Sequence, residues 1–507
     1  MIQFLEKVKF SYNFINYRFN CSIIEEMKND VLIIGAGVTG SLLARELAKY
    51  DLNVVVIEKE NDVGNVTSSA NSAIVHSGYD PKPGSLKALL NHRGCLKYPK
   101  LCDELDVSFS NCGTLTLVDD ESQWPQFKAL LERSKENGVP VEVLNAEQVR
   151  KLEPNLADNV LGGFLAKEAG IVNPFELVVH AMENAVDNGV KLHLNEEVIS
   201  IKDNGDYFEV KTNQAIYETK VVINAAGLYS DKVASMEEDI DWHIIPRKGE
   251  YILLDRLSTP LVSRPIFPLP SEKGKGILVA PTTAGNVFMG PSSEPQEDKD
   301  DYSTDGATLA NVRSNAFRLV KNIPTRETIR VFAGVRATPS THDFVIGPSK
   351  KNDKFINVAG IESPGLASSP AIAEYVIDNF VSKVLELKEK KDFNPRVRKH
   401  IKMKLLSKEE RNRLIKENPD FGKVVCNCET VSLGEIKDEL SRSVPPHSIK
   451  GVKRRTRAGF GRCQGGYCLG IVSMTLASHY HIDETEVDYD GLGTNLIIDE
   501  IKKVKHD

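Results

Sequence analysis

A glycine-rich turn between a short apolar run and a helical pattern restricts the fold of this chain more than any other feature. The run Val31–Ile34 is of the kind that is buried on both faces of a parallel sheet. Residues 35–40 then read Gly-Ala-Gly-Val-Thr-Gly, and apolar residues follow at helical spacing over Ser41–Ala48. A second apolar run, Val54–Ile57, comes next. This order of strand, turn, helix and strand predicts an α/β domain that binds a dinucleotide.

Each glycine of the turn has a physical task. Gly35 permits the tight turn, Gly37 lets backbone amides approach a pyrophosphate, and Gly40 allows helix and strand to pack closely. The positive end of the helix then faces the phosphates. Glu58 follows 23 residues after Gly35, where its carboxylate can accept both hydroxyls of an unphosphorylated ribose. The expected dinucleotide is FAD or NAD rather than NADP, and an ordinary structural turn is the alternative.

Four cysteines near the C-terminus form a second distinctive pattern. Cys426 and Cys428 belong to a CxC motif, and Cys463 and Cys468 bound the run Cys-Gln-Gly-Gly-Tyr-Cys. Four thiolates in two close pairs can hold either a two-iron, two-sulfur cluster or a tetrahedral zinc ion, and spacing alone leaves both open. A dinucleotide site and a metal site in one polypeptide indicate a redox enzyme.

Composition and charge exclude several classes of protein. At about 100 to 200 residues per domain, the 507 residues predict about three domains. A net charge of −7 disfavours nonspecific nucleic-acid binding, and no apolar run is long enough to span a bilayer, although peripheral membrane contact stays open. Eight cysteines, half of them clustered, fit a reducing cytoplasm better than a secreted disulfide scaffold. The remaining cysteines are expected as buried apolar side chains: Cys21, Cys95, Cys102 and Cys112.

The segment 67–88 resembles a known flavoprotein family. In its residues from Thr67 to Tyr79, and in Pro-Gly-Ser-Leu-Lys-Ala at its end, it is similar to D-amino-acid oxidase, FAD-linked glycerol-3-phosphate dehydrogenases and L-2-hydroxyglutarate dehydrogenases. Asn-Ala-Ala-Gly at 224–227 and the glycine-rich run at 357–366 extend the resemblance over most of residues 30–380. The dinucleotide is then expected to be FAD.

The resemblance implies further contacts with FAD. The residues concerned are Thr67, Ser68, Asn71, Ser72, Ala226, Gly227, Gly360, Gly365 and Leu366. In this family the late glycine-rich turn leads a helix whose positive end stabilises the negative charge of reduced flavin. Ser368, Ser369 and Pro370 predict the cap and first turn of that helix, with an ordinary surface helix as the alternative.

The resemblance also implies the substrate contacts. His76 is expected to remove the hydroxyl proton while hydride passes to FAD, because imidazole titrates near neutral pH; contact with flavin or covalent attachment of flavin is the competing role. Arg336 aligns with the family arginine that grips a substrate anion through two parallel hydrogen bonds, and an ordinary salt bridge is the alternative. Lys248 is expected as a second anion contact.

The cysteine-rich segment resembles a second module. Residues 426–429 and 461–468 are similar to the bacterioferritin-associated-ferredoxin-like module, which also ends the large subunit of anaerobic glycerol-3-phosphate dehydrogenases. This resemblance favours a 2Fe-2S cluster on the four cysteines over structural zinc. The basic residues of 450–462 would then lie near an anionic cluster rather than bind nucleic acid. Ser432 and Glu435, spaced as a capping box, predict a helix between the two cysteine pairs.

The predicted fold is α/β, or α+β overall, with a Rossmann-like FAD-binding domain interleaved with an antiparallel-sheet substrate domain. A small helical 2Fe-2S domain follows. Met27 lies four residues before the first strand and is the expected natural start. The expected boundaries are 1–27 for an extension, 28–90, 150–240 and 330–385 for the FAD-binding domain, 91–149 and 241–329 for the substrate domain, 386–421 for a charged helical linker, 422–485 for the 2Fe-2S domain and 486–507 for a tail.

Together these features predict a FAD-dependent dehydrogenase that oxidises a small anionic hydroxy substrate and passes electrons through the cluster to a redox partner protein or quinone. Glycerol-3-phosphate is the expected substrate, and L-2-hydroxyglutarate or another 2-hydroxy acid is the alternative. A phosphate dianion and a dicarboxylate make similar demands on Arg and Lys, so residue chemistry leaves both open. A noncatalytic electron-transfer subunit is the second alternative, and homo- or hetero-oligomers are both open.

Overall fold

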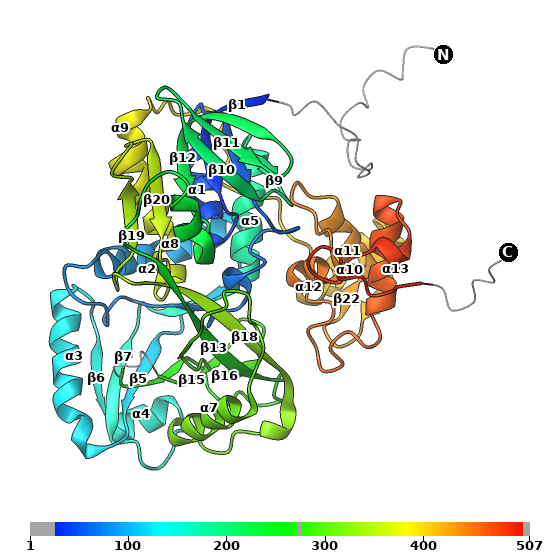
Figure 1. Cartoon of the computed structure of the whole chain (residues 1–507). Helices are drawn as coiled ribbons and strands as arrows, with labels where there is room; N and C mark the ends of the chain where they lie inside the picture. The colour runs from blue at the N-terminus through cyan, green and yellow to red at the C-terminus, as the bar shows by residue number, and fades with distance from the viewer. Residues whose placement is uncertain (1–25, 271–275, 500–507) are drawn as a thin grey trace.

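Two large sheets, one above the other in Figure 1, build the main body of the protein, and a smaller helical module lies beside them. This computed structural model describes residues 26–270 and 276–499. The predicted N-terminal extension overlaps the first strand at residues 26 and 27, and its remainder, with Cys21, lies outside the described residues. Within the described ranges, no helix is both long and apolar enough to cross a membrane.

The upper, eight-stranded sheet contains the strands on either side of the glycine-rich turn. β1 (Glu26–Ile34) pairs in parallel with β2 (Val54–Ile57) on one side and with β12 (Ile216–Asn224) on the other. β9 (Lys191–His193) extends the sheet beyond β2, and β20 (Phe355–Ala359) pairs in parallel with the end of β12. The apolar runs of β1 and β2 therefore lie at the centre of the sheet, buried on both faces.

Helices cover one face of this sheet, and β10 (Val198–Asp203) and β11 (Phe208–Thr212), which form an antiparallel meander with β12, pack over the other. Alternation along β1 sends Val31 and Ile33 toward the helices and the intervening side chains toward the meander. The covering helices are α1 (Val38–Leu47), α2 (Leu86–Glu104), α5 (Pro174–Asp187) and α8 (Gly365–Val376).

The lower, nine-stranded sheet is antiparallel apart from one parallel pair. Its long strands β13 (Ile244–Leu254) and β18 (Thr328–Pro339) pair along most of their lengths. One face of β13 packs on α7 (Gly306–Leu319), and the other faces the upper unit, where a Cβ on Gly334 would lie 2.0 Å from the carbonyl oxygen of Ala70. The two units therefore meet through nearly bare backbone.

The structure corrects the predicted boundaries between these two units. The break expected at residue 90 falls inside α2, which packs on the first core as one helix. β7 (Gly162–Ala166) pairs with β5 (Thr114–Val118) in the lower sheet, although residues 150–240 were assigned to the FAD-binding domain. β18 also belongs to the lower sheet. Apolar patterning identifies a strand but not its partner, because tertiary contacts decide which sheet it joins.

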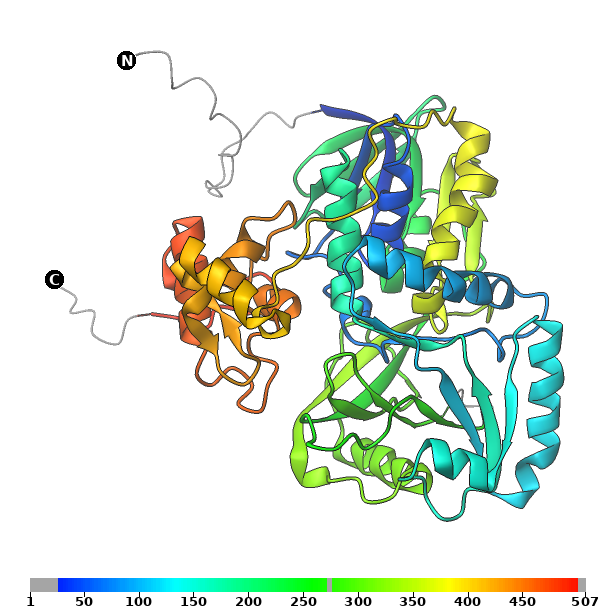
Figure 2. The same cartoon turned by 180° about the vertical axis from the view of Figure 1, so that it is seen from behind.

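The segment that leads to the module is not the helical connector expected over 386–421. It runs extended along the main body in Figure 2, and its one regular α-helix is α10 (Lys408–Glu417). Phe393 packs against the core of the upper unit, and His400 is buried. The high charge content suggested a solvated helix, but these contacts with the main body hold the chain extended.

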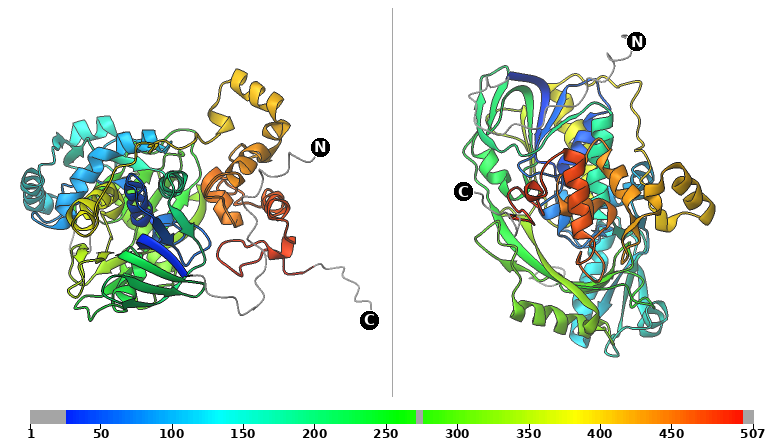
Figure 3. Two further views of the ribbon diagram at one scale, coloured as in Figure 1. Left: turned by 90° about the horizontal axis from the view of Figure 1, so that it is seen from above. Right: turned by 90° about the vertical axis from the view of Figure 1, so that its right-hand side faces the viewer.

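The C-terminal module has a core of its own and lies against the side of the main body (Figure 3). Its helices are α11 (Leu433–Leu440), α12 (Ile449–Thr456) and α13 (Leu469–Tyr480). The capping box predicted from Ser432 and Glu435 is present at the start of α11. Cys426 and Cys468 are buried in this core.

Candidate active site and metal centre

The glycine-rich turn forms part of a cavity of about 400 Å³ beside β1 and β2. Gly35 has a φ of +104°, and a Cβ there would lie 2.5 Å from the carbonyl oxygen of Ala225. A Cβ on Gly40 would lie 1.9 Å from the carbonyl oxygen of Gly35, so only glycine lets α1 approach the turn this closely. Gly37 is the N-cap of α1 and lines the cavity. The turn thus has the shape that a pyrophosphate requires.

Glu58 lines the same cavity from the end of β2. Its carboxylate accepts hydrogen bonds from the backbone N–H groups of Ala36 at 2.7 Å and Glu60 at 3.0 Å. Burial raises the pKa of Glu58, and the two backbone donors oppose that effect only in part. A carboxylate held in this position suits the hydroxyls of an unphosphorylated ribose.

The segment 67–72 joins the two units beside the N-terminus of α1. The Oγ of Ser68 accepts from the backbone N–H of Val38 at 2.9 Å, and the hydroxyl of Thr67 donates to the carbonyl of Val335 at 2.9 Å. The predicted FAD contacts that line this cavity or the one next to it are Thr67, Ser68, Asn71, Ser72, Ala226, Gly227, Gly365 and Leu366. Gly360 lines neither cavity; its φ of +65° and its contact with Pro339 serve the turn after β20.

The adjoining cavity has a volume of about 160 Å³ and contains the expected catalytic pair. His76 reaches it from the segment after β3 (Ile74–Val75), and Arg336 reaches it from β18 in the other unit. His76 is 8% exposed, and its ring centroid lies 5.7 Å from that of Phe267. Asn91 of α2 donates to the His76 carbonyl at 2.6 Å and fixes the backbone there. An imidazole held in this way can accept a proton from a hydroxyl in the cavity.

Strand alternation separates the two predicted anion contacts. Arg336 pairs across the ladder with Arg247 of β13, on the face toward the upper unit. Lys248 is the next residue and therefore lies on the other face, where it binds Asp301 at 2.8 Å. The expectation that Lys248 contacts a substrate anion is corrected, because neighbouring side chains of a strand point to opposite faces.

Two residues on the cavity face of β13 were not selected from the sequence. Tyr251 lines the cavity, lies 3.2 Å from the hydroxyl of Ser72 and stacks on Phe332 with ring centroids 4.7 Å apart. Arg247 lies opposite Arg336 and donates to the hydroxyl of Ser293 at 3.3 Å. The spacing of two residues that runs from Arg247 through Gly249 to Tyr251 is the signal that places them on one face.

α8 begins at Gly365, before the predicted cap at Ser368 and Ser369. Pro370 is therefore inside the helix and cannot donate to the carbonyl of Leu366. The hydroxyls of Tyr98 and Ser369 donate to that carbonyl instead. Pro364, Gly365 and Leu366 line the smaller cavity, so the N-terminus of α8 faces it. The positive end of the helix can stabilise negative charge that develops there.

The four predicted metal ligands lie in two sulfur pairs. The Sγ atoms of Cys428 and Cys463 are 3.6 Å apart, and the thiol of Cys468 donates to Cys426, which lowers the pKa of Cys426 to about 6 despite its burial. Each pair joins the two motifs rather than the neighbours within one motif. Two separate pairs suit two irons.

The cysteine loops of the module rest on the sheet that lines the smaller cavity. Arg256, directly after β13, donates to the carbonyl of Cys428 at 2.6 Å and binds Glu429 at 3.3 Å. Arg457 binds Glu429 at 2.9 Å and donates to Asn286 at 3.1 Å. These contacts hold the thiolates close to the unit that contains Arg336.

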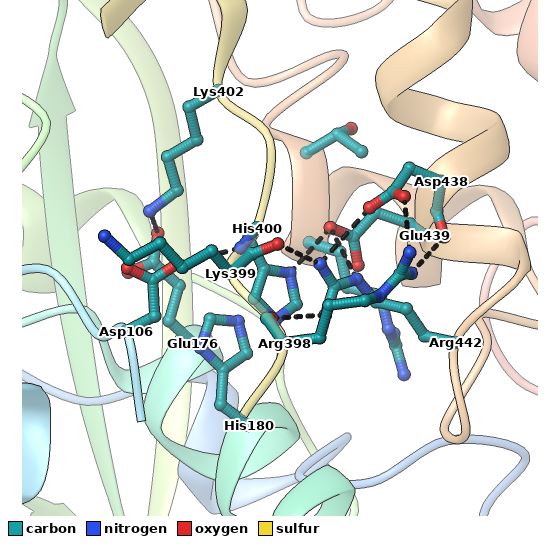
Figure 4. Close-up of polar contacts among 12 residues, drawn as sticks. Asp106, Glu176, His180, Arg398, Lys399, His400, Lys402, Asp438, Glu439 and Arg442 are labelled. Carbon is teal, nitrogen blue, oxygen red and sulfur yellow. Dashed lines mark hydrogen bonds and ion pairs between the residues drawn. The ribbon is translucent and has the colours of Figure 1, made fainter. Parts of the chain in front are cut away.

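A buried cluster of charges, which we call the docking cluster, fastens the module to α5 (Figure 4). The ring of His400 lies between Glu183 of α5, at 3.0 Å, and Glu439 of α11, at 2.7 Å, and it stacks on His180 with centroids 3.6 Å apart. Burial disfavours the charged ring, but the two carboxylates outweigh it and raise the pKa of His400 to about 9. Arg442, 3.5 Å from Glu183, completes the cluster.

A second buried contact fixes the other side of the module. Both oxygens of Asp62 accept from Arg455 at 2.8 Å, and Arg454 binds the same carboxylate at 3.0 Å. Burial alone would raise the pKa of Asp62, but the two guanidinium groups hold it well below the usual range. Asp62 precedes Gly64, which lines the dinucleotide cavity, by two residues. The paired carboxylate of Asp62 therefore helps to position the module relative to that cavity.

Comparison with known proteins agrees with both sites. The sequence matches the family of FAD dependent oxidoreductases over residues 30–379 and the BFD-like [2Fe-2S] binding domain over residues 424–477. It is 45% identical over 469 residues to a protein named glycerol 3-phosphate dehydrogenase from Caloramator mitchellensis, covering 92% of this chain and 98% of that one. A mitochondrial L-2-hydroxyglutarate dehydrogenase from Arabidopsis thaliana is 27% identical over 411 residues, covering 71% of this chain and 84% of that one.

The fold has a solved counterpart as well. The dithionite-reduced L-alpha-glycerophosphate oxidase from Mycoplasma pneumoniae, with FAD bound, aligns with a TM-score of 0.70 and 27% identity, covering 73% of this chain and 98% of that one. The glycine turn, the carboxylate of Glu58 and the paired cysteines fit the FAD and the 2Fe-2S cluster that these families are named for. The chain therefore belongs to the FAD dependent oxidoreductase family and is an oxidoreductase whose cofactors are FAD and a 2Fe-2S cluster.

Proposed function

We propose that the protein is a dehydrogenase that oxidises the secondary hydroxyl of glycerol-3-phosphate and releases electrons through its C-terminal module. The observation that carries this proposal is the placement of His76 and Arg336 on one small cavity, at the N-terminus of α8. One residue can handle a proton and the other can bind an anion, and they come from different units. The relative from Caloramator mitchellensis, with a matching name and 98% of its length covered, supports the choice of substrate.

The roles of the residues follow from their chemistry. Arg336 would hold the phosphate through two parallel hydrogen bonds and so fix the distance to the hydroxyl-bearing carbon. His76 would take the hydroxyl proton as the carbon–oxygen double bond forms and the C–H electron pair leaves as hydride. Bound FAD supplies the acceptor for that hydride. The stacked ring of Phe332 keeps Tyr251 at the wall of the cavity, where its hydroxyl can orient a polar substrate.

The exit of electrons is part of the proposal. The cysteine pairs lie on loops that contact the lower sheet through Arg256, and electrons would leave the flavin cavity toward this side of the sheet. The final acceptor would be a redox protein or quinone. Free buried thiols at Cys95 and Cys102 support a reducing, cytoplasmic location.

The experiment is an anaerobic test of flavin bleaching. Purified holoprotein is mixed with glycerol-3-phosphate, L-2-hydroxyglutarate or another 2-hydroxy acid, and the flavin absorbance is followed. We expect bleaching by glycerol-3-phosphate, a rate at least about 100-fold lower in His76→Ala because a general base contributes about that much, and retained FAD in that variant. Bleaching by L-2-hydroxyglutarate alone would show that the substrate is this 2-hydroxy acid, as the name of the Arabidopsis relative allows. Bleaching by none of the compounds would favour a noncatalytic electron-transfer subunit.

A further inference from the structure

A cavity that we call the entry cleft lies between the main body and the module and is lined by residues of both. It has a volume of about 740 Å³, within the range of small-molecule sites. Five cationic and three acidic side chains line it, together with hydroxyl groups from residues such as Thr282 and Ser303. Four of the cations come from the basic run of the module, on or next to α12, which faces the main body (Figure 1).

Three of the five cations already pair with carboxylates. Asp490 binds Lys450 at 2.6 Å and Arg454 at 3.3 Å. Arg457 binds Glu429 at 2.9 Å. These pairs leave a surplus of positive charge on the two remaining cations, one from each side of the cleft.

The remaining cations are Lys453 of the module and Arg330 of β18. Among the described residues, no carboxylate lies within ion-pair distance of either. Lys453 is 6% exposed, and its Nζ lies 4.6 Å from the ring centroid of Phe460. The nearest polar contact of Arg330 is the side-chain oxygen of Gln464 at 3.5 Å. A buried ammonium that lines a cavity and pairs with no carboxylate among the described residues is stabilised by an anion that enters beside it.

The electrostatic surroundings of Lys453 show the same surplus of positive charge. Burial, together with the nearby charges of Arg330 and Lys450, lowers the pKa of Lys453 to about 7, although the charge of Cys468 acts in the opposite direction. An anion between Lys453 and Arg330 would remove that repulsion and favour the charged lysine.

The entry cleft adjoins the cavity of His76. Ala70, Asn71 and Ala73 line both spaces. Phe332 lines the cleft, and Tyr251, stacked on it, lines the smaller cavity. One face of the β13–β18 ladder therefore runs from the cleft to the catalytic cavity.

That face carries a cation at each end. Arg330 and Arg336 are separated by an even number of residues on β18, so they share the face toward the upper unit. An anionic group moving along this face passes from one guanidinium to the other. The cleft has the position and the charge of an entrance for a small anion.

We propose that the entry cleft is an anion-binding vestibule, in which Lys453 and Arg330 capture the phosphate of the substrate before it reaches Arg336. The identity of the anion rests on the proposed function; the existence of the site does not. The module would then have two tasks, to carry electrons and to complete the substrate entrance. Cationic lining of a cleft raises the local concentration of an anionic substrate and its rate of capture.

The first measurement is anaerobic rapid mixing of the holoenzyme with glycerol-3-phosphate. We expect Lys453→Met and Arg330→Met each to raise the apparent Kd for flavin bleaching by about tenfold. The limiting rate should stay within about twofold, because neither residue touches the reacting atoms. Lys453→Arg, which keeps the charge, should restore most of the affinity. Lys423→Met is the matched control: Lys423 is an exposed lysine of the same module, paired with Asp420.

The second measurement uses inorganic phosphate and does not depend on turnover. Equilibrium dialysis of labelled phosphate against the holoenzyme should show binding that Lys453→Met weakens about tenfold and Lys423→Met leaves unchanged. Iron content and the visible spectrum check that Lys453→Met keeps its cluster, and Arg330→Met on the other unit repeats the test if it does not. Unchanged phosphate binding and unchanged Kd in both variants would overturn the vestibule. Absence of bleaching in the unaltered enzyme would overturn the substrate while the phosphate result still decides the site.

Discussion

Single residues decide the chemistry of this site through the side of an element on which they lie. Arg336 was the expected anion contact and Lys248 a second one, yet only Arg336 lies on the cavity. His76 was selected from its motif, and the structure gives it an apolar wall and a fixed backbone. The difference between these outcomes is geometric, since a motif on a loop carries its own geometry and a strand position depends on alternation.

Arg336 and Lys248 make a matched pair of cations. Arg336→Met should raise the KM for the anionic substrate by at least about 100-fold, because a charged hydrogen-bonded contact of about 2 to 3 kcal/mol is lost. Lys248→Met should change KM by less than about threefold, since its partner is Asp301, on the face of the strand away from the cavity. Steady-state kinetics of both variants with the same substrate would measure the two changes in KM. Equal losses in the two variants would contradict the placement of Lys248.

A substitution at Gly40 tests the glycine-rich turn without changing the substrate site. Gly40→Ala would place a Cβ 1.9 Å from the carbonyl oxygen of Gly35 and push α1 away from the turn. We expect loss of FAD from the purified protein and a free energy of unfolding lower by about 1 to 3 kcal/mol, the usual range for overpacking. Flavin content and chemical denaturation measure the two effects. Gly138→Ala is the control, because a Cβ at Gly138 meets nothing within 4 Å, although its φ of +69° adds modest strain.

At the scale of elements, several helices and strands each contribute one part of the site, and no single element contains the whole site. β1 and α1 supply the cradle, β18 supplies Arg336, and the N-terminus of α8 supplies a positive end. α5 and α11 then meet in the docking cluster, which holds the module in position (Figure 4). The position of the 2Fe-2S ligands relative to the flavin cavity thus depends on a buried imidazole.

The docking cluster predicts a loss of docking at alkaline pH. The folded-state pKa of His400 is raised from 6.5 to about 9, so its contribution is complete below about pH 6.5 and is lost as the pH rises through about 9. The neutral ring would leave Glu183 and Glu439 buried with Arg442 as their remaining cation. His180, whose pKa burial and the adjacent His400 lower to about 3, stays neutral throughout.

Hydrogen exchange of α11 between pH 7 and 10 measures this effect. We expect faster exchange above about pH 9 in the unaltered protein, after correction for the intrinsic rate. His400→Gln should show the faster exchange at every pH, since removing one partner of a buried ion pair costs about 3 to 5 kcal/mol. A flat profile in the unaltered protein would show that His400 does not control docking.

At the scale of the whole molecule, the protein is a flavin-binding body with a metal module attached by two buried charge contacts. Each part has its own hydrophobic core, so loss of the metal need not unfold the rest. The module touches the lower sheet through Arg256 and Arg457 and the upper unit through Asp62. Electron transfer and substrate entry would both depend on this arrangement.

Removal of the cluster tests the division of labour. Cys463→Ser takes one sulfur from the pair with Cys428 and should abolish the iron-sulfur absorption. FAD content and substrate bleaching of flavin should remain within about twofold, because the flavin cavities share no residue with that pair. Reduction of an external one-electron acceptor should fall by at least about tenfold. Loss of FAD in this variant would show that the two sites are not independent.

The sequence by itself determined the local features whose geometry is encoded in a few adjacent residues. These include the glycine turn with its flanking strands, the carboxylate after β2, the capping box of α11 and the four cysteines. In each case backbone sterics or ligand chemistry admits only a few residue types at fixed spacing, so the pattern is readable without the fold.

Only the tertiary structure decided which distant segments meet. It placed β7 and β18 in the lower sheet, turned Lys248 away from the cavity, started α8 before Pro370 and held residues around His400 extended instead of helical. The physical reason is common to these cases. Strand pairing, burial and charge neutralisation are properties of contacts between residues far apart in the chain, and local propensity is too weak to outweigh them.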